Sequence, residues 1–175
     1  MTSLQNLIEG FHRFREQHFT DDDTLYRQLV QDGQTPKILV VACCDSRVDP
    51  ALEFGVRNLN VEHIIVLGHA HCGGIRALMS GRRTNNDDSF INSWMRLAGD
   101  ARTRTEQELA NDVPEIQARA CERHAILGSL DNLMTFPWIR ERVEQGTLAL
   151  HGWYFDIECG ELLGYNPASR KFEVL

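Results

Sequence analysis

Residues 61–75, VEHIIVLGHAHCGGI, constrain the fold more than any other stretch of the chain. An apolar run with several β-branched residues ends in a glycine, and His69, His71, Cys72 and two more glycines follow it. An apolar run without polar alternation is typical of a parallel strand that is covered on both faces. The pattern therefore predicts a buried strand at 63–67 that turns at once into a helix.

A second stretch, KILVVACCDSRVDP at residues 37–50, has the same organisation. Its apolar run at 38–42 predicts another buried strand, and Cys43, Asp45 and Arg47 come directly after it. The carboxyl ends of neighbouring parallel strands meet at the same edge of a sheet, where ligands bind in open α/β sheets. We therefore expect the polar residues of the two stretches to lie together.

Strands and helices alternate along the rest of the chain, which predicts an α/β fold. We expect a mainly parallel central sheet with an antiparallel edge strand, flanked by helices, within one domain over residues 1–175. The amphipathic pattern near the start predicts a helical N-terminal arm at 1–33. Strands are expected at 38–42, 63–67, 148–157 and 161–165, and helices at 51–60, 73–79, 90–99, 106–135 with a break near Val113 and Pro114, and 137–145.

Composition excludes some classes of function. The net charge of -7 argues against a nucleic-acid or anionic-membrane binder, because affinity for phosphates needs a basic surface. No run approaches the ~20 apolar residues of a membrane span, and the first residues lack the pattern of a secretory signal. Five cysteines at irregular spacing suggest reduced thiols rather than a disulfide framework. We expect a cytoplasmic protein that binds neither nucleic acid nor membrane.

The two strand ends together predict a metal site. Cys43, His69 and Cys72 supply two thiolates and an imidazole, a set that suits one Zn(II) per chain and leaves the fourth position open. Asp45 and Arg47 share one side of an extended segment with Cys43. Asp45 can therefore bind the metal as a fourth ligand, or it can pair with Arg47 and leave that position to water.

Other interpretations of the motifs remain open. A glycine-rich turn between a strand and a helix often binds phosphate, a lone H-x-x-C is a weak signal, and a closed structural zinc site would use the same ligands. Two such motifs at the ends of two apolar strands favour a catalytic metal centre. His71 and His151 are candidates for a proton relay, although packing in a strand is the simpler interpretation of His151.

The paired motifs C-C-D-S-R and G-H-A-H-C-G-G resemble those of the β-class carbonic anhydrases. The family pattern is C-x-D-x-R followed by H-x-x-C, and this chain fills every position of it. The resemblance implies four parallel strands plus an antiparallel one, a zinc ion held by Cys43, His69 and Cys72, and catalytic roles for Asp45 and Arg47. It also implies a homodimer or tetramer in which the N-terminal helices embrace the neighbouring subunit.

One departure from the family pattern stands out. Arg47 and His69 are only 22 positions apart. Family members normally carry an additional strand and loop between the C-x-D-S-R motif and the helix before H-x-x-C. That piece normally supplies an edge strand, part of the dimer contact and residues of the substrate pocket, so we predict a chain that lacks it.

The resemblance implies reversible hydration of carbon dioxide to bicarbonate. Two alternatives follow from the same residues. One is hydrolysis of carbonyl sulfide or carbon disulfide at the same site. The other is an inactive, zinc-stabilised remnant with a binding or assembly role.

Overall fold

The computed structural model describes residues 13, 16, 37–42, 50–81 and 98–175. The chain divides into two compact units, Met1–Thr35 and Pro36–Leu175. The predicted N-terminal arm lies outside the described residues except for Arg13 and Glu16, whose backbone is helical. The organisation as a single domain stays a prediction, and the sheet and the helices described below belong to the second unit.

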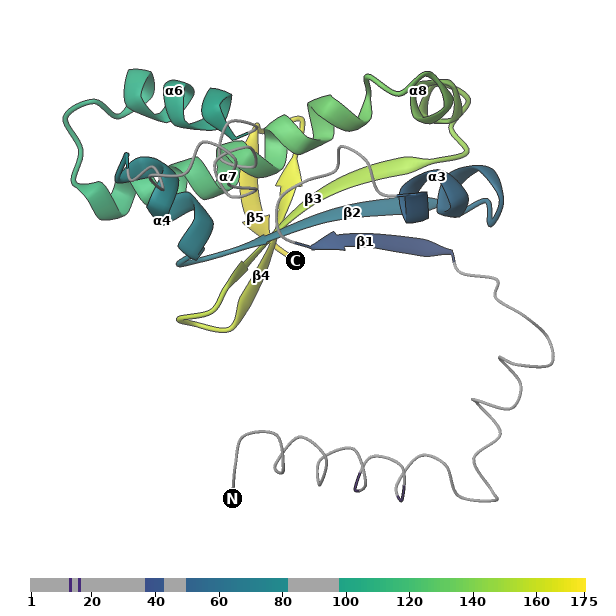
Figure 1. Ribbon diagram of the computed structural model, residues 1–175, viewed down its shortest axis with the longest axis horizontal. Helices are drawn as coiled ribbons and strands as arrows, with labels where there is room; N and C mark the ends of the chain where they lie inside the picture. The colour runs from purple at the N-terminus through teal and green to yellow at the C-terminus, as the bar shows by residue number, and fades with distance from the viewer. Residues whose placement is uncertain (1–12, 14–15, 17–36, 43–49, 82–97) are drawn as a thin grey trace, which may run out of the picture. The chain divides into compact units, whose positions relative to one another are not determined.

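A five-stranded sheet forms the centre of this unit, in the order β1-β2-β3-β4-β5 (Figure 1). The first three strands are parallel, and β4 and β5 are antiparallel to their neighbours. Long crossovers connect the parallel strands, as that geometry requires. The strands are β1 Ile38–Ala42, β2 His63–His69, β3 Ala149–Asp156, β4 Glu161–Asn166 and β5 Lys171–Val174.

Five helices are described in this unit, and three of them begin at a proline. Proline suits the first helical position because its fixed φ fits the helix and its missing N–H would have no partner there. Glu53 and Arg57 form an i,i+4 ion pair on α3, at 2.8 Å. The helices are α3 Pro50–Arg57, α4 Gly73–Met79, α6 Gly99–Glu108, α7 Pro114–Leu133 and α8 Pro137–Glu144. No helix in the described part of the chain is long and apolar enough to cross a membrane.

The longest of the described helices, α7, crosses the sheet over β2 and β3, and α6 packs against α7 (Figure 1). The main core lies between the sheet and α3, α7 and α8. Ile64 and Val66 of β2 point into it and are at most 4% exposed. Its other buried members are Leu52, Val56, Val61, Ala70, Ile126, Leu133, Ile139, Leu148 and Tyr154.

Two glycines allow α7 to approach the sheet closely. A Cβ at Gly68 of β2 would lie 2.7 Å from Ile126 Cδ1, and a Cβ at Gly152 of β3 would lie 2.9 Å from Ile126 Cγ2. Neither distance is compatible with a side chain at these positions unless the Ile126 side chain or the helix shifts. The absence of a side chain on both strands therefore sets the position of Ile126 and, through it, the position of α7.

The predicted fold class is confirmed, with differences in detail. Among the described residues there are three parallel strands and two antiparallel ones, whereas we expected one antiparallel edge strand and, from the resemblance, four parallel strands. The prediction omitted β5. We also expected a helix that ends at Gly99, and this boundary is wrong, because Gly99 is the first residue of α6. The predicted break near Val113 and Pro114 is confirmed, since α7 begins at Pro114.

Candidate metal centre

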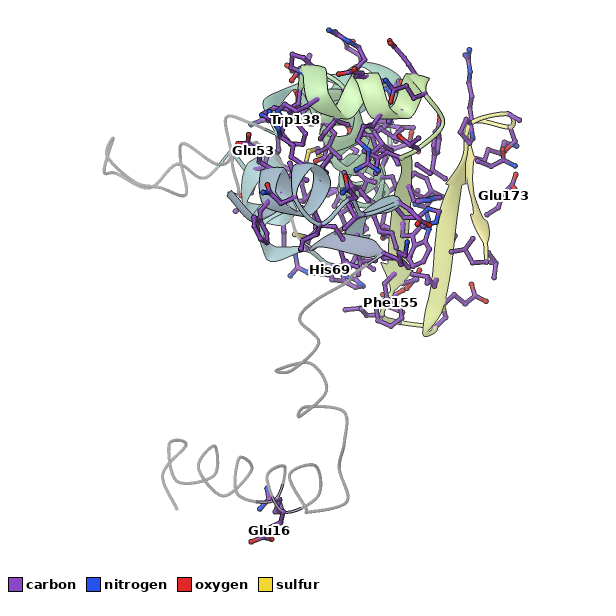
Figure 2. The ribbon with its side chains drawn as sticks, turned by 90° about the vertical axis from the view of Figure 1, so that its right-hand side faces the viewer. Glu16, Glu53, His69, Trp138, Phe155 and Glu173 are labelled. Atoms are coloured by element: carbon purple, nitrogen blue, oxygen red, sulfur yellow. The ribbon has the colours of Figure 1, made fainter. Side chains whose placement is uncertain are left out.

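His69 is the last residue of β2, and Cys72 directly precedes α4. The two residues share one tight turn because Ala70 and His71 are the only residues between them. The Ala70 N–H donates to the Phe155 carbonyl of β3 at 2.9 Å and holds the turn against the sheet. His69 and Phe155 are in register on adjacent strands and lie at the same end of the sheet (Figure 2). His69 is partly buried, and Cys72 is 8% exposed.

The hydrogen bond of the His69 ring fits a metal ligand. Its Nδ1 lies 2.8 Å from the Ala70 carbonyl oxygen. A carbonyl oxygen only accepts, so Nδ1 carries the hydrogen and Nε2 of the neutral ring keeps its lone pair. Histidines that bind metals usually donate their other ring N–H in this way, which fixes the tautomer and the orientation of the ring. The donor chemistry of His69 and Cys72 therefore fits zinc.

The backbone of Cys72 is held by an acidic residue of α7. The Cys72 N–H donates to Glu122 Oε1 at 2.8 Å, and the Tyr154 hydroxyl of β3 donates to Glu122 Oε2 at 2.7 Å. Glu122 is 5% exposed and Tyr154 is 0% exposed. Burial, together with the neighbouring Glu122 carboxylate, raises the pKa of Tyr154. The two oxygens of one buried carboxylate on α7 thus accept hydrogen bonds from the turn before α4 and from β3.

Sequence analysis did not identify Glu122. The available signal was a single acidic residue between the apolar positions Cys121, Ala125 and Ile126 of a long helix. An acidic residue on the buried stripe of a helix needs a partner, and this one finds it across the core. A small pocket lies beside Glu122, His69 and Cys72, and its remaining wall consists mainly of apolar side chains of β2, α4 and α7.

His71 lies in the same turn but, unlike Cys72, it is exposed. It adopts a left-handed backbone conformation with φ of 58°, which is uncommon for a residue other than glycine. Its Nε2 pairs with Glu158, which also pairs with Arg119 of α7. The hydrogen bond with His71, and after it the hydrogen bond with Arg119, lower the pKa of Glu158. The pairs connect the turn between β2 and α4 to the turn between β3 and β4.

The other predicted ligands adjoin the end of the neighbouring strand. Cys43, Asp45 and Arg47 lie outside the described residues. β1 ends at Ala42, the residue before Cys43, and Ala42 is in register with Leu67 of β2. Among the residues that the structure describes, no three His, Cys, Asp or Glu side chains form a metal-binding group. The assignment of Cys43, Asp45, His69 and Cys72 as one ligand set stays a prediction.

His151 packs in the sheet, away from this turn. Its Nε2 lies 3.1 Å from Nδ1 of His63, and burial and then the charge of His63 lower the pKa of His151. It is in register with Ile65, four residues before His69 on β2. At 3.3 Å per residue this corresponds to about 13 Å along the strand. The arrangement favours a packed strand histidine over a relay at the metal centre.

Comparison with known proteins identifies the fold and its relatives. Residues 50–162 match the family model described as Carbonic anhydrase. The chain is 36% identical to Beta carbonic anhydrase 5, chloroplastic, of Arabidopsis thaliana, over 89% of this chain and 63% of the relative. It is 29% identical to Carbonic anhydrase 1 of Escherichia coli O157:H7, over 97% of this chain and 91% of the relative. The chain thus spans less than two thirds of the Arabidopsis relative.

Solved structures agree with this result. The structure of the β-carbonic anhydrase CcaA matches with a TM-score of 0.87 and 30% identity, over 98% of this chain and 92% of that one. The alignment with the Escherichia coli relative extends over 202 positions, more than the 175 residues of this chain, so that relative has residues that this chain lacks. That such residues are missing between Arg47 and His69 stays a prediction.

Proposed function

Because this chain belongs to the β-class carbonic anhydrase family, we propose that it is an enzyme, a lyase that catalyses the reversible hydration of carbon dioxide to bicarbonate. The observation that carries the proposal is the turn after β2. It places a buried cysteine three residues after a histidine whose Nδ1–H is already committed to a backbone carbonyl.

Zinc, one ion per chain, is the cofactor that this donor set fits. Cys43, His69 and Cys72 would hold it, and Asp45 would be either a fourth ligand or the partner of Arg47. When bound, zinc lowers the pKa of a coordinated water to roughly 7 and so supplies hydroxide at neutral pH.

The residues of the chain then have separate tasks. Where Asp45 is not a ligand, Arg47 would pair with it and hold its carboxylate off the metal. Asp45 would then accept a hydrogen bond from the attacking water and orient its oxygen lone pair toward carbon dioxide. The ring hydrogen bond of His69 and the backbone hydrogen bond of Cys72 would hold these two ligands in place for the metal. The released proton passes to buffer.

We further propose that the chain acts in the cytoplasm as a homodimer or tetramer. β1 is one of the two edge strands of the described sheet, and Ile38 and Val40 on it are 51% and 52% exposed although both are large and apolar. Exposed apolar residues on an edge strand favour contact with another chain. A second copy is the partner that the family resemblance implies.

The test is stopped-flow measurement of carbon dioxide hydration by zinc-loaded protein. We expect His69→Gln and Cys72→Ser to remove the activity and one zinc per chain. The matched controls are His151→Gln, on a packed strand histidine, and Cys159→Ser, on an exposed cysteine of the β3–β4 turn. Both should keep zinc and activity. Asp45→Asn and Arg47→Ala should keep most of the zinc and lose most of the activity.

The same preparations distinguish the alternatives. Hydrolysis of carbonyl sulfide or carbon disulfide without carbon dioxide hydration would point to the hydrolase. One bound zinc per chain with neither activity would point to the inactive remnant. A zinc content that does not respond to Cys72→Ser would refute the proposed metal centre itself.

A further inference from the structure

Glu122 occupies an unusual position for an acidic residue. It lies in the middle of α7, it is 5% exposed, and both of its carboxylate oxygens accept a hydrogen bond. One donor is the backbone N–H of Cys72, and the other is the hydroxyl of the fully buried Tyr154. A buried carboxylate is costly to keep, and hydrogen bonds to both oxygens are what makes its burial possible.

The packing of α7 determines where this carboxylate lies. Ile126 contacts the sheet at the bare backbone of Gly68 and Gly152. Glu122 is four residues before Ile126, so both side chains lie on the same face of the helix. A helix that contacts β2 at Gly68 therefore presents its preceding turn to the end of β2, where His69 and the turn to Cys72 begin.

Cys72 is the residue before α4, and in a capping box the side chain three residues later accepts a hydrogen bond from the N–H of this position. Here that residue is Ile75, whose side chain has no acceptor. The acceptor comes instead from a helix 50 residues later in the sequence. A change at Glu122 thus reaches the backbone of Cys72 without altering the local sequence of the turn.

We propose that Glu122 is a positioning residue of the metal centre. Held by Tyr154, it fixes the backbone of Cys72 and with it the direction of the thiolate. This inference rests on the proposed function, in which Cys72 binds zinc. Outer partners of metal ligands typically change metal affinity or activity by 10- to 100-fold when they are lost.

The test compares Glu122→Ala, Glu122→Gln and Tyr154→Phe with the wild-type chain. Zinc affinity is measured by competition with a colorimetric chelator, and the geometry of the site is measured by the thiolate-to-metal absorption band of the cobalt-substituted protein. Glu122→Ala should weaken zinc binding about 10- to 100-fold and shift the cobalt band. Glu122→Gln keeps an acceptor for the Cys72 N–H and should therefore retain most of the zinc affinity of the wild type. Glu115→Ala, an exposed position on the same helix, is the matched control and should change neither quantity.

A purely structural role would give a different result. Glu122→Ala would then lower the melting temperature of the metal-free protein and leave the zinc affinity and the cobalt band of the folded fraction unchanged, which would overturn the proposal. If Glu122→Ala does not fold, Tyr154→Phe decides, because it removes one hydroxyl and retains the ring. The expected result is weaker zinc binding with a shifted cobalt band, and wild-type values in both would overturn the proposal.

The controls separate this inference from the function on which it rests. If wild-type protein binds no zinc, or if Cys72→Ser does not reduce binding, the proposed metal centre fails. If Cys72→Ser removes the zinc while the variants at Glu122 and Tyr154 behave as wild type, only the positioning role fails.

Discussion

Gly152→Ala tests whether the close contact between α7 and β3 sets the packing of this fold. The added Cβ would lie 2.9 Å from Ile126 Cγ2 and 3.1 Å from Leu130 Cδ1. The Cγ2 methyl of Ile126 moves only by rotation about χ1, and a β-branched residue in a helix strongly prefers one χ1 rotamer, so relief of the contact needs an unfavourable rotamer or a shift of the helix. Adding one methyl to a well-packed core typically costs about 1–3 kcal/mol. We expect a loss of this size in the free energy of unfolding.

A double-mutant cycle with Ile126→Ala shows whether this contact is the cause. Ile126 is 3% exposed, and truncating a buried isoleucine to alanine costs about 2–5 kcal/mol. In the double variant the new methyl of residue 152 enters space that Ile126 has vacated. The double variant should therefore be no less stable than Ile126→Ala alone, with a favourable coupling of about 1–3 kcal/mol, within the range seen for contacting residues.

Gly128→Ala is the matched control, a glycine-to-alanine change on α7 itself. A Cβ at Gly128 would meet no atom within 4 Å, so it adds no clash. Alanine also favours the helix, and the change should stabilise the protein by about 0.4–1 kcal/mol. Urea unfolding followed by circular dichroism measures all four variants. Costs of Gly152→Ala and Ile126→Ala that add to within about 0.5 kcal/mol would refute the close-packing argument.

Three further predictions concern groups away from that contact. Arg142 donates to three backbone carbonyl oxygens, so Arg142→Ala should lower the free energy of unfolding by about 2–3 kcal/mol in urea titration, and an unchanged value would contradict this. Burial and then the charge of Arg104 lower the pKa of His124 below 6.5, so the unfolded state binds more protons just below that pH. Stability should fall as the pH drops through this window, and His124→Gln should flatten the fall in melting temperature. The hydrogen bond from the backbone N–H of Glu158 is the main cause that lowers the pKa of Asp156. The stability that this carboxylate contributes is therefore present above pH 3.8, the ordinary pKa of the group, and is lost as the pH falls through its lower pKa in the folded protein. Asp156→Asn should reduce the loss of stability at acid pH. A profile of melting temperature against pH that runs parallel to that of the wild type would contradict this role of Asp156.

The sequence predicted the parts of the fold that rest on local pattern. The apolar runs identify β1 and β2 as strands, and Pro114 and Pro137 mark helix starts at positions where proline fits. β2 is buried as expected, whereas the expectation that β1 is covered on both faces is wrong, because Ile38 and Val40 of this edge strand are 51% and 52% exposed. The turn after β2 is confirmed as a strand that passes directly into α4. These features depend on neighbouring residues only, and a single sequence contains them.

The elements that were missed depend on partners far along the chain. The dipeptide Asn166-Pro167 is typical of a turn, but β5 after it has only four residues, and of these only Phe172 is partly buried, so the apolar pattern is too short to identify a strand. Its pairing with β4 is what makes it a strand. α6 is very polar and buries only Ala101 and Thr105, so its apolar stripe is too narrow to identify its boundaries. In both cases tertiary contact, rather than propensity, decides the structure.

The hydrogen bond from Cys72 to Glu122 shows the same limit at the candidate site, and it gives the two glycines a role beyond packing. A motif search finds the residues that bind a metal, because their spacing is local. The group that orients the Cys72 backbone is 50 residues away, and it reaches Cys72 because α7 lies close enough to the sheet. Gly68 and Gly152 permit that approach. A side chain at Gly152 would press on Ile126 and Leu130 and push α7, with Glu122 on it, away from the sheet, so Gly152→Ala should weaken zinc binding as well as stability if the positioning role of Glu122 is correct.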